Sequence, residues 1–148
     1  MTQPPVTMFT IGFARKGART FFTLLKSAGV SALLDVRLHN SSQLAGYTKR
    51  DDLAFLCEAV LGITYRHVTE LAPTQEMLDR FKRHDGGWRR YEDDFLALMR
   101  ERRIEQLPRE LFAKACLLCA EPTADHCHRR LAAEYLRQAW HDITIVHL

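Results

Sequence analysis

The sequence has few of the features that would place it in a specialised class of protein. Its longest apolar runs, such as residues 31–36 and 114–120, are far shorter than the ~20 residues that span a bilayer. Glycine and proline are scarce, at 7 and 5 of 148 residues, which excludes collagenous and low-complexity chains. With 47% hydrophobic residues, the chain is not disordered either. These absences predict a single domain, over residues 1–148, that buries a core.

A targeting signal is also missing. Residues 1–5 lack the basic residue and the long apolar stretch of a signal peptide, so we expect a cytoplasmic protein with no membrane partner. In that compartment the four cysteines are expected to be thiols or ligands, not disulfides. The sequence contains no signal from which an oligomeric state could be predicted.

The sequence has little net charge, because it contains 21 Lys and Arg and 18 Asp and Glu residues. The small excess lies in residues 80–103, where eight basic residues face five acids. A basic segment can contact phosphates, so a nucleic-acid or nucleotide-binding module is one hypothesis. The alternative is a solvated helical face on which Asp93, Asp94 and Glu101 pair with basic neighbours. The modest size of the excess favours the solvated face.

Strand-like and helix-like segments alternate from end to end. Short apolar segments predict strands at residues 8–13, 30–36, 63–68, 114–120 and 143–147. Apolar residues at helical spacing predict helices at residues 20–28, 51–61, 75–83, 91–103 and 127–140. Gly29 and Gly62 are expected to end the first two helices, and Asp51 or Asp52 to cap the second. The alternation predicts a single-domain α/β fold, with a mostly parallel five-stranded sheet, helices on both faces and a helical insertion before strand four.

In such folds ligands bind at the carboxyl ends of the strands, where this sequence places ionisable residues. Asp35 and Arg37 close the second strand, and the polar run that follows extends to Ser42, a further ligand-binding candidate. Glu121 follows the fourth strand. We predict that Arg37 holds an anionic group and that Asp35 and Glu121 transfer or orient protons. The alternative is that Asp35 and Arg37 pair with other charges and fix the loop.

The start of the last helix carries two further candidates, His128 and Arg129. Cations near the positive end of a helix are unfavourable unless an anion joins them, which predicts a phosphate or carboxylate pocket. Arg129 would bind the anion and His128 would transfer protons. Alternatively, Arg129 and Arg130 pair with Glu134 or with solvent. The leading hypothesis is an enzyme that binds a small anionic ligand, phosphorylated or nucleotide-like, at the carboxyl ends of the strands. No cofactor is predicted, and whether the protein is an enzyme stays open.

The four cysteines admit three interpretations. Cys116, Cys119, Cys127 and His128 offer four zinc ligands, but residues three apart on a strand face opposite ways. Cys116 and Cys119 therefore cannot close on one ion, and we predict no metal while keeping a structural zinc protein as an alternative. Cys127, at a helix start beside His128, is expected to have a lowered pKa, and with Cys119 it is a ligand-binding or nucleophile candidate. Cys57 and Cys116 are expected in the core.

Together these motifs resemble those of the domain-of-unknown-function 488 proteins. The resemblance rests on Thr10-Ile11-Gly12, on Asp35-Val36-Arg37, on residues 62–67, and on the block that runs from Leu118-Cys119-Ala120-Glu121-Pro122 to Cys127-His128-Arg129. The chain departs from the broad pattern at Phe13-Ala14, where a His-Ser pair is usual, at Asn40, where Pro is common, and at Ala72-Pro73, where two glycines are common. Residues 37–46 instead match a subgroup reading Arg-Leu-x-Asn-x-Ser-Gln-Leu-Ala-Gly. The resemblance implies an α/β fold and a shared site, and it names no reaction.

Overall fold

The centre of the molecule is one parallel five-stranded sheet. The computed structural model describes residues 4–41, 46–121 and 123–148, and its strands lie in the order β3-β2-β4-β1-β5. Their bounds are β1 Val6–Gly12, β2 Ala32–Asp35, β3 Thr64–His67, β4 Ala115–Cys119 and β5 Ile143–His147. The predicted α/β fold with a parallel five-stranded sheet is therefore confirmed.

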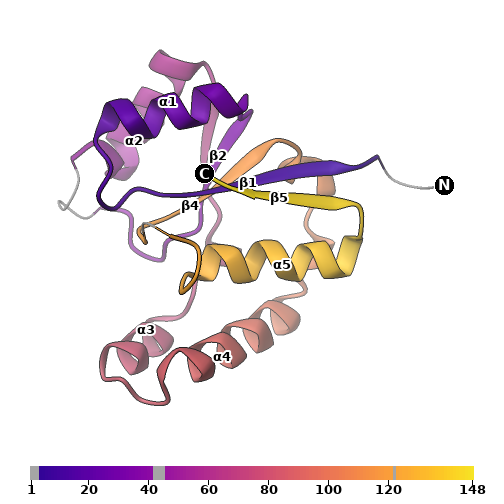
Figure 1. Cartoon of the computed structure of the whole chain (residues 1–148). Helices are drawn as coiled ribbons and strands as arrows, with labels where there is room; N and C mark the ends of the chain where they lie inside the picture. The colour runs from indigo at the N-terminus through magenta and orange to yellow at the C-terminus, as the bar shows by residue number, and fades with distance from the viewer. Residues whose placement is uncertain (1–3, 42–45, 122) are drawn as a thin grey trace.

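Helices cover both faces of this sheet (Figure 1). On one face lie α1 (Ala18–Ala28) and α2 (Arg50–Leu56), and on the other lies α5 (His128–Trp140). The predicted insertion before β4 consists of α3 (Gln75–Lys82) and α4 (Gly87–Arg102), which lie on the same side as α5. Strand β4 serves both cores, because Leu117 and Cys119 face α5 while Cys116 and Leu118 face α1.

Most helix ends follow from the sequence. Gly29 and Gly62 end helical segments with φ values of 71° and 66°, in the left-handed region that glycine adopts without strain. The predicted cap of the second helix was wrong: Lys49 is the N-cap, and Asp51 and Asp52 lie in the first turn, where their charges favour the helix dipole.

Several shorter helical segments complete the chain. A π-helical turn, Cys57–Leu61, extends α2, and 3₁₀ turns lie at Gly46–Thr48, Thr69–Leu71, Ile104–Gln106 and Arg109–Phe112. Within the described residues, no helix is long and apolar enough to cross a membrane.

The connections after the central strands diverge. The chain leaves β1 and β2 toward the face that carries α1 and α2, whereas it leaves β4, which lies between them, toward α5 on the opposite face. Such a reversal opens a crevice at the carboxyl ends of the strands, which is where ligands bind in open α/β sheets.

The basic segment is a partly paired helical surface. Arg80 contacts Glu76 at 3.1 Å and Asp94 at 3.6 Å, and Arg90 contacts Asp85 at 3.7 Å and Asp94 at 3.8 Å. These exposed pairs neutralise part of the local excess of positive charge. Nucleic-acid binding by this surface stays a hypothesis.

Candidate functional site

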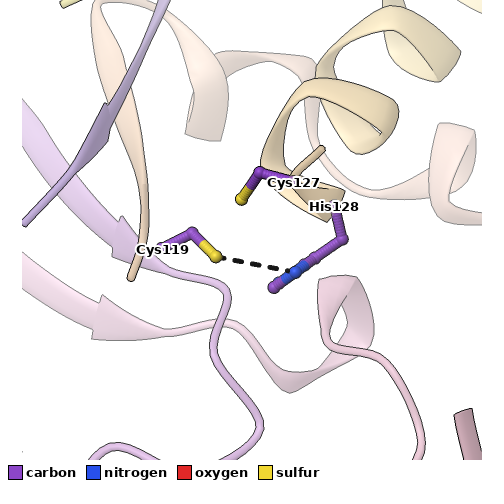
Figure 2. A group of neighbouring side chains, drawn as sticks. All are labelled: Cys119, Cys127 and His128. Atoms are coloured by element: carbon purple, nitrogen blue, oxygen red, sulfur yellow. Dashed lines mark hydrogen bonds between the residues drawn. The ribbon is translucent and has the colours of Figure 1, made fainter. Parts of the chain in front are cut away.

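Three side chains of metal-ligating type meet where β4 ends and α5 begins (Figure 2). Cys119 is the last residue of β4, Cys127 is the N-cap of α5, and His128 is the first residue of that helix. Their sulfur and ring nitrogen atoms all lie within 4.8 Å of one another, and Sγ of Cys119 is 3.6 Å from Nδ1 of His128. All three residues are buried. We call this group the Cys-Cys-His cluster.

The fold fixes which nitrogen of His128 faces the cysteines. Nε2 lies 2.7 Å from the backbone oxygen of Val36, which follows β2. A carbonyl oxygen only accepts, so Nε2 carries the proton and donates it to this bond. Nδ1 therefore presents its lone pair toward Cys119. Burial lowers the pKa of His128, with the charge of Arg129 contributing in the same direction, which favours this neutral form.

The two cysteines of the cluster differ in acidity. A hydrogen bond from Cys127 lowers the pKa of Cys119 in spite of burial, and backbone N–H groups of Glu121 and Ala120 act in the same direction. The predicted lowering of the Cys127 pKa was wrong, because burial raises it and the neighbouring Cys119 raises it further. Position at a helix start was a poor guide here, since the thiol is buried.

Arg129 lies behind the cluster and is fully buried. Its Nη1 donates a 2.8 Å hydrogen bond to the backbone oxygen of Glu121, while its Nε is buried without a partner in the part of the chain that the structure describes. Its positive charge favours the thiolate form of Cys119. Gly12 makes room for this arrangement, because a Cβ there would lie 1.4 Å from the Glu121 oxygen. Arg130, in contrast, pairs with Glu134 at 3.2 Å, as the alternative interpretation of this helix start had it.

Asp35 and Arg37 form a buried ion pair with each other. The carboxylate of Asp35 accepts from Nε of Arg37 at 2.9 Å and from Nη2 at 2.8 Å, and it also accepts from the hydroxyl of Tyr65. Arg37 donates further to the backbone oxygen of Thr48 at 2.7 Å. Burial alone would lower the pKa of Arg37, but the hydrogen bond and charge of Asp35 outweigh it and raise that pKa. The pair anchors the loop after β2, and the proton-transfer role of Asp35 stays a prediction.

A half-open cavity of about 230 Å³ lies in front of the cluster, at the carboxyl edge of the sheet. The loops after β2 and β4 contribute Arg37, Leu38, His39, Ala120 and Glu121. The segment that includes α3 and α4 contributes Pro73, Leu78, Phe81, Trp88 and Tyr91, and His126 precedes α5. Cys119, Cys127 and His128 complete the lining. The cavity is therefore largely apolar, with the cluster as its most polarisable part.

The aromatic part of this lining was not predicted from the sequence. Trp88 stacks on Tyr91 with ring centroids 5.2 Å apart and on His126 at 4.9 Å, and Phe81 meets Trp88 edge-on at 6.0 Å. Residues 80–103 were considered from the sequence for their charge and for helical spacing, and no aromatic residue there was named as part of a site. In the sequence, Trp88 directly follows the turn-like segment Asp85-Gly86-Gly87. An aromatic residue beside a turn was the signal from which its place near a binding site could have been predicted.

The structure brings some of the predicted site residues together and separates others. Five of them line the cavity: Arg37, Cys119, Glu121, Cys127 and His128. Asp35 and Arg129 are buried outside its lining. Ser42 lies outside the residues that the structure describes. As predicted, Cys57 and Cys116 are core residues, each 0% exposed.

Comparison with known families adds to this geometry. A family model described as "Domain of unknown function DUF488" matches residues 17–136. The chain belongs to the DUF488 family. The match includes the Asp35-Val36-Arg37 motif and the whole block that forms the Cys-Cys-His cluster, while β1 precedes it. No curated protein and no solved structure matches the chain. The DUF488 description names no activity, so the function has to be argued from the site.

Proposed function

We propose that this DUF488 protein is a metal-dependent enzyme whose metal ion is held by Cys119, Cys127 and His128. One observation carries the proposal: two cysteine sulfur atoms and one imidazole nitrogen lie within 4.8 Å of one another, on three residues that line a cavity. With bond lengths of about 2.3 Å to sulfur and 2.0–2.1 Å to nitrogen, ligands of a tetrahedral zinc ion are roughly 3.5–3.8 Å apart. The 3.6 Å between Cys119 Sγ and His128 Nδ1 has this size.

The surroundings of the cluster also suit a thiophilic divalent ion such as zinc. Two thiolates balance the charge of the ion, so the buried assembly is neutral and its desolvation costs less than that of a bare charge. The hydrogen bond from Nε2 of His128 to the Val36 oxygen orients the ring, as backbone carbonyls do for zinc-bound histidines. Cys116, the fourth zinc ligand considered from the sequence, faces the other core, and a site made of Cys119, Cys127 and His128 does not need it.

The number of ligands favours a catalytic ion over a structural one. Structural zinc sites are closed by four protein ligands, whereas catalytic sites have three and keep an open position. Here the cluster lines the cavity, so the fourth position would face it. A metal ion in such a position supplies Lewis-acid chemistry, which activates water or polarises a carbonyl group. Glu121, which lines the same cavity, is our candidate for the proton transfer that hydrolysis requires.

Under this proposal, Arg37 and Arg129 no longer have the anion-binding role that was predicted from the sequence. The guanidinium of Arg37 is engaged by Asp35 and by the Thr48 oxygen, and Arg129 is fully buried outside the cavity lining. We assign both residues to positioning: Arg37 holds the loop after β2, and Arg129 holds the Glu121 backbone beside the cluster.

Metal analysis of the purified protein tests the proposal. After reconstitution with zinc and removal of excess ion, we expect about one zinc per chain for the unmodified protein. Cys119→Ser, Cys127→Ser and His128→Asn should each lose most of it, because a three-ligand site cannot spare one. Cys57→Ser and Cys116→Ser are matched controls that leave the cluster intact. The proposal is contradicted if all five variants retain zinc, or if neither the unmodified protein nor any variant binds it.

A second candidate function is supported by the contact between Cys119 and His128. A thiol within reach of an imidazole that a backbone carbonyl orients is the arrangement of a cysteine nucleophile. In that case the protein binds no zinc, and iodoacetamide modifies Cys119 first, in a reaction that His128→Asn slows. Mass spectrometry of the modified peptides distinguishes the two functions.

A further inference from the structure

We propose that the cavity beside the Cys-Cys-His cluster takes a planar, uncharged aromatic or heteroaromatic compound of one or two rings. This inference rests on the proposed function, because it names the substrate class of the same site. It is carried by the aromatic residues that α3, α4 and the segment before α5 contribute to the lining of this cavity, which we call the aromatic wall.

The wall is made of stacked rings. Trp88 lies nearly parallel to both Tyr91 and His126, with an interplanar angle of 22° in each case. Phe81 meets Trp88 edge-on and is 38% exposed, although it is a large apolar side chain at the cavity. Aromatic side chains bind a further ring by stacking or edge contacts, with centroids about 4.5–7 Å apart. Pro73 and Leu78 extend the same apolar wall.

The charge of the cavity disfavours an anion. Among the described lining residues, the one permanently charged cation is Arg37, and Asp35 neutralises it at 2.8 Å. His39 is hydrogen-bonded to Gln75, and His126 is stacked on Trp88. Glu121 adds a negative charge at the same cavity. Because the two thiolates of the cluster already balance the charge of the proposed ion, a ring compound that carries a phosphate would meet this carboxylate without a free cation among the described lining residues to compensate it.

The size of the cavity agrees with a small ring system. A closed apolar cavity of about 150 Å³ holds benzene. At about 230 Å³ and half open, this one accommodates one or two fused rings while leaving a reacting group near the cluster. The aromatic wall therefore binds the ring, and the adjacent cluster faces the polar substituent of that ring.

Three probes with the same metal-binding group test the inference in protein loaded with cobalt(II). At pH 8, imidazole and 4-phenylimidazole are mainly neutral, and imidazole-4-acetate is an anion. We expect 4-phenylimidazole to shift the cobalt absorption bands at a concentration at least about ten-fold lower than imidazole, because a phenyl ring gains that much from burial. Imidazole-4-acetate should bind no better than imidazole. Equal binding of the phenyl and plain probes, or strongest binding of the anion, overturns the inference.

Variants of the wall identify its contribution. Trp88→Leu should remove most of the ten-fold advantage of 4-phenylimidazole over imidazole, whereas Trp88→Phe should keep most of it. Phe55→Leu, at an aromatic residue that is 67% exposed and outside the cavity lining, is the matched control and should change neither. An advantage that survives Trp88→Leu contradicts the assigned role of the wall.

Tryptophan fluorescence separates failure of this inference from failure of the proposed function. The chain has two tryptophans, and Trp140→Phe leaves Trp88 as the single reporter. If cobalt gives no thiolate spectrum, the metal proposal fails, and quenching of Trp88 by 4-phenylimidazole but not by imidazole still supports the ring site. No quenching by 4-phenylimidazole overturns the ring site whether or not cobalt binds.

Discussion

Asp35 shows what a single buried charge does in this molecule. Its carboxylate has 0% side-chain exposure and is the counter-charge of Arg37, so Asp35→Asn leaves a buried guanidinium without compensation. Breaking a buried pair by removing one partner costs about 3–5 kcal/mol, and we expect a loss of that order in the free energy of unfolding measured with urea.

Asp51 provides the matched control for this prediction. It pairs with Arg50 at 3.1 Å, but its side chain is 88% exposed. Exposed pairs contribute about 0–1 kcal/mol, so Asp51→Asn should leave the free energy of unfolding nearly unchanged. Equal losses for Asp35→Asn and Asp51→Asn would show that the pair beside the cavity has no special role in stability.

Gly12 is a second residue whose size matters. Gly12→Ala would place a methyl group 1.4 Å from the Glu121 oxygen and 2.9 Å from Nη1 of Arg129, so the loop between β4 and α5 must move. We expect a loss of about 1–3 kcal/mol in the free energy of unfolding, together with reduced zinc content, because this loop joins Cys119 to Cys127.

Gly17→Ala is the control for Gly12→Ala. No atom lies within 4 Å of a Cβ at Gly17, and its φ of −73° suits any residue, so the change should stay within about 0.5 kcal/mol and leave zinc content unaltered. Full zinc content in the Gly12→Ala protein would mean that the loop does not position the cluster.

At the scale of elements, the cap of α3 contributes to the aromatic wall. The side chain of Thr74 accepts a hydrogen bond from the backbone N–H of Met77 at 3.2 Å, and the helix it starts carries Leu78 and Phe81. Thr74→Ala should cost about 1 kcal/mol of stability and weaken binding of 4-phenylimidazole, while Thr74→Ser retains both. Urea unfolding measures the change in stability, and the cobalt titration measures probe binding. Unaltered binding of 4-phenylimidazole by the Thr74→Ala protein would show that α3 does not contribute to the aromatic wall.

The elements themselves were largely predictable, because their signals are local. Apolar runs gave the five strands to within about two residues, and Gly29 and Gly62 marked helix ends since both adopt left-handed conformations. Starts were harder to place. The helix that contains Tyr91 begins at Gly87, because Gly86, with φ of 82°, already caps it. No local signal distinguishes that start from a longer turn.

At the scale of the whole molecule, the basic segment should not act as a nucleic-acid interface. Arg80 and Arg90 share Asp94 as a partner, so part of the positive charge is compensated. We expect no saturable binding of duplex DNA or RNA by fluorescence anisotropy at about 50 mM salt. Saturable binding that falls steeply toward about 200 mM salt would contradict this expectation.

The site was predictable only in part, for reasons of geometry. The strands of a parallel sheet all end at one edge, so the convergence of Asp35 and Cys119 at that edge follows from the predicted fold. The pairing of β2 with β4, which makes the two residues neighbours, was not predicted from the sequence. The direction in which each side chain points could not be predicted from the sequence. Arg129 turns inward to the Glu121 carbonyl and not toward a ligand, and Trp88 reaches the cavity from an insertion whose docking depends on tertiary packing.

The proposed metal ion has three protein ligands and one open position. X-ray absorption at the zinc edge of the reconstituted protein measures this coordination directly. We expect two sulfur atoms at about 2.3 Å, one imidazole nitrogen at about 2.0 Å and one further light atom. Shells of three or four sulfur atoms, or a zinc ion bound by oxygen and nitrogen alone, would contradict it.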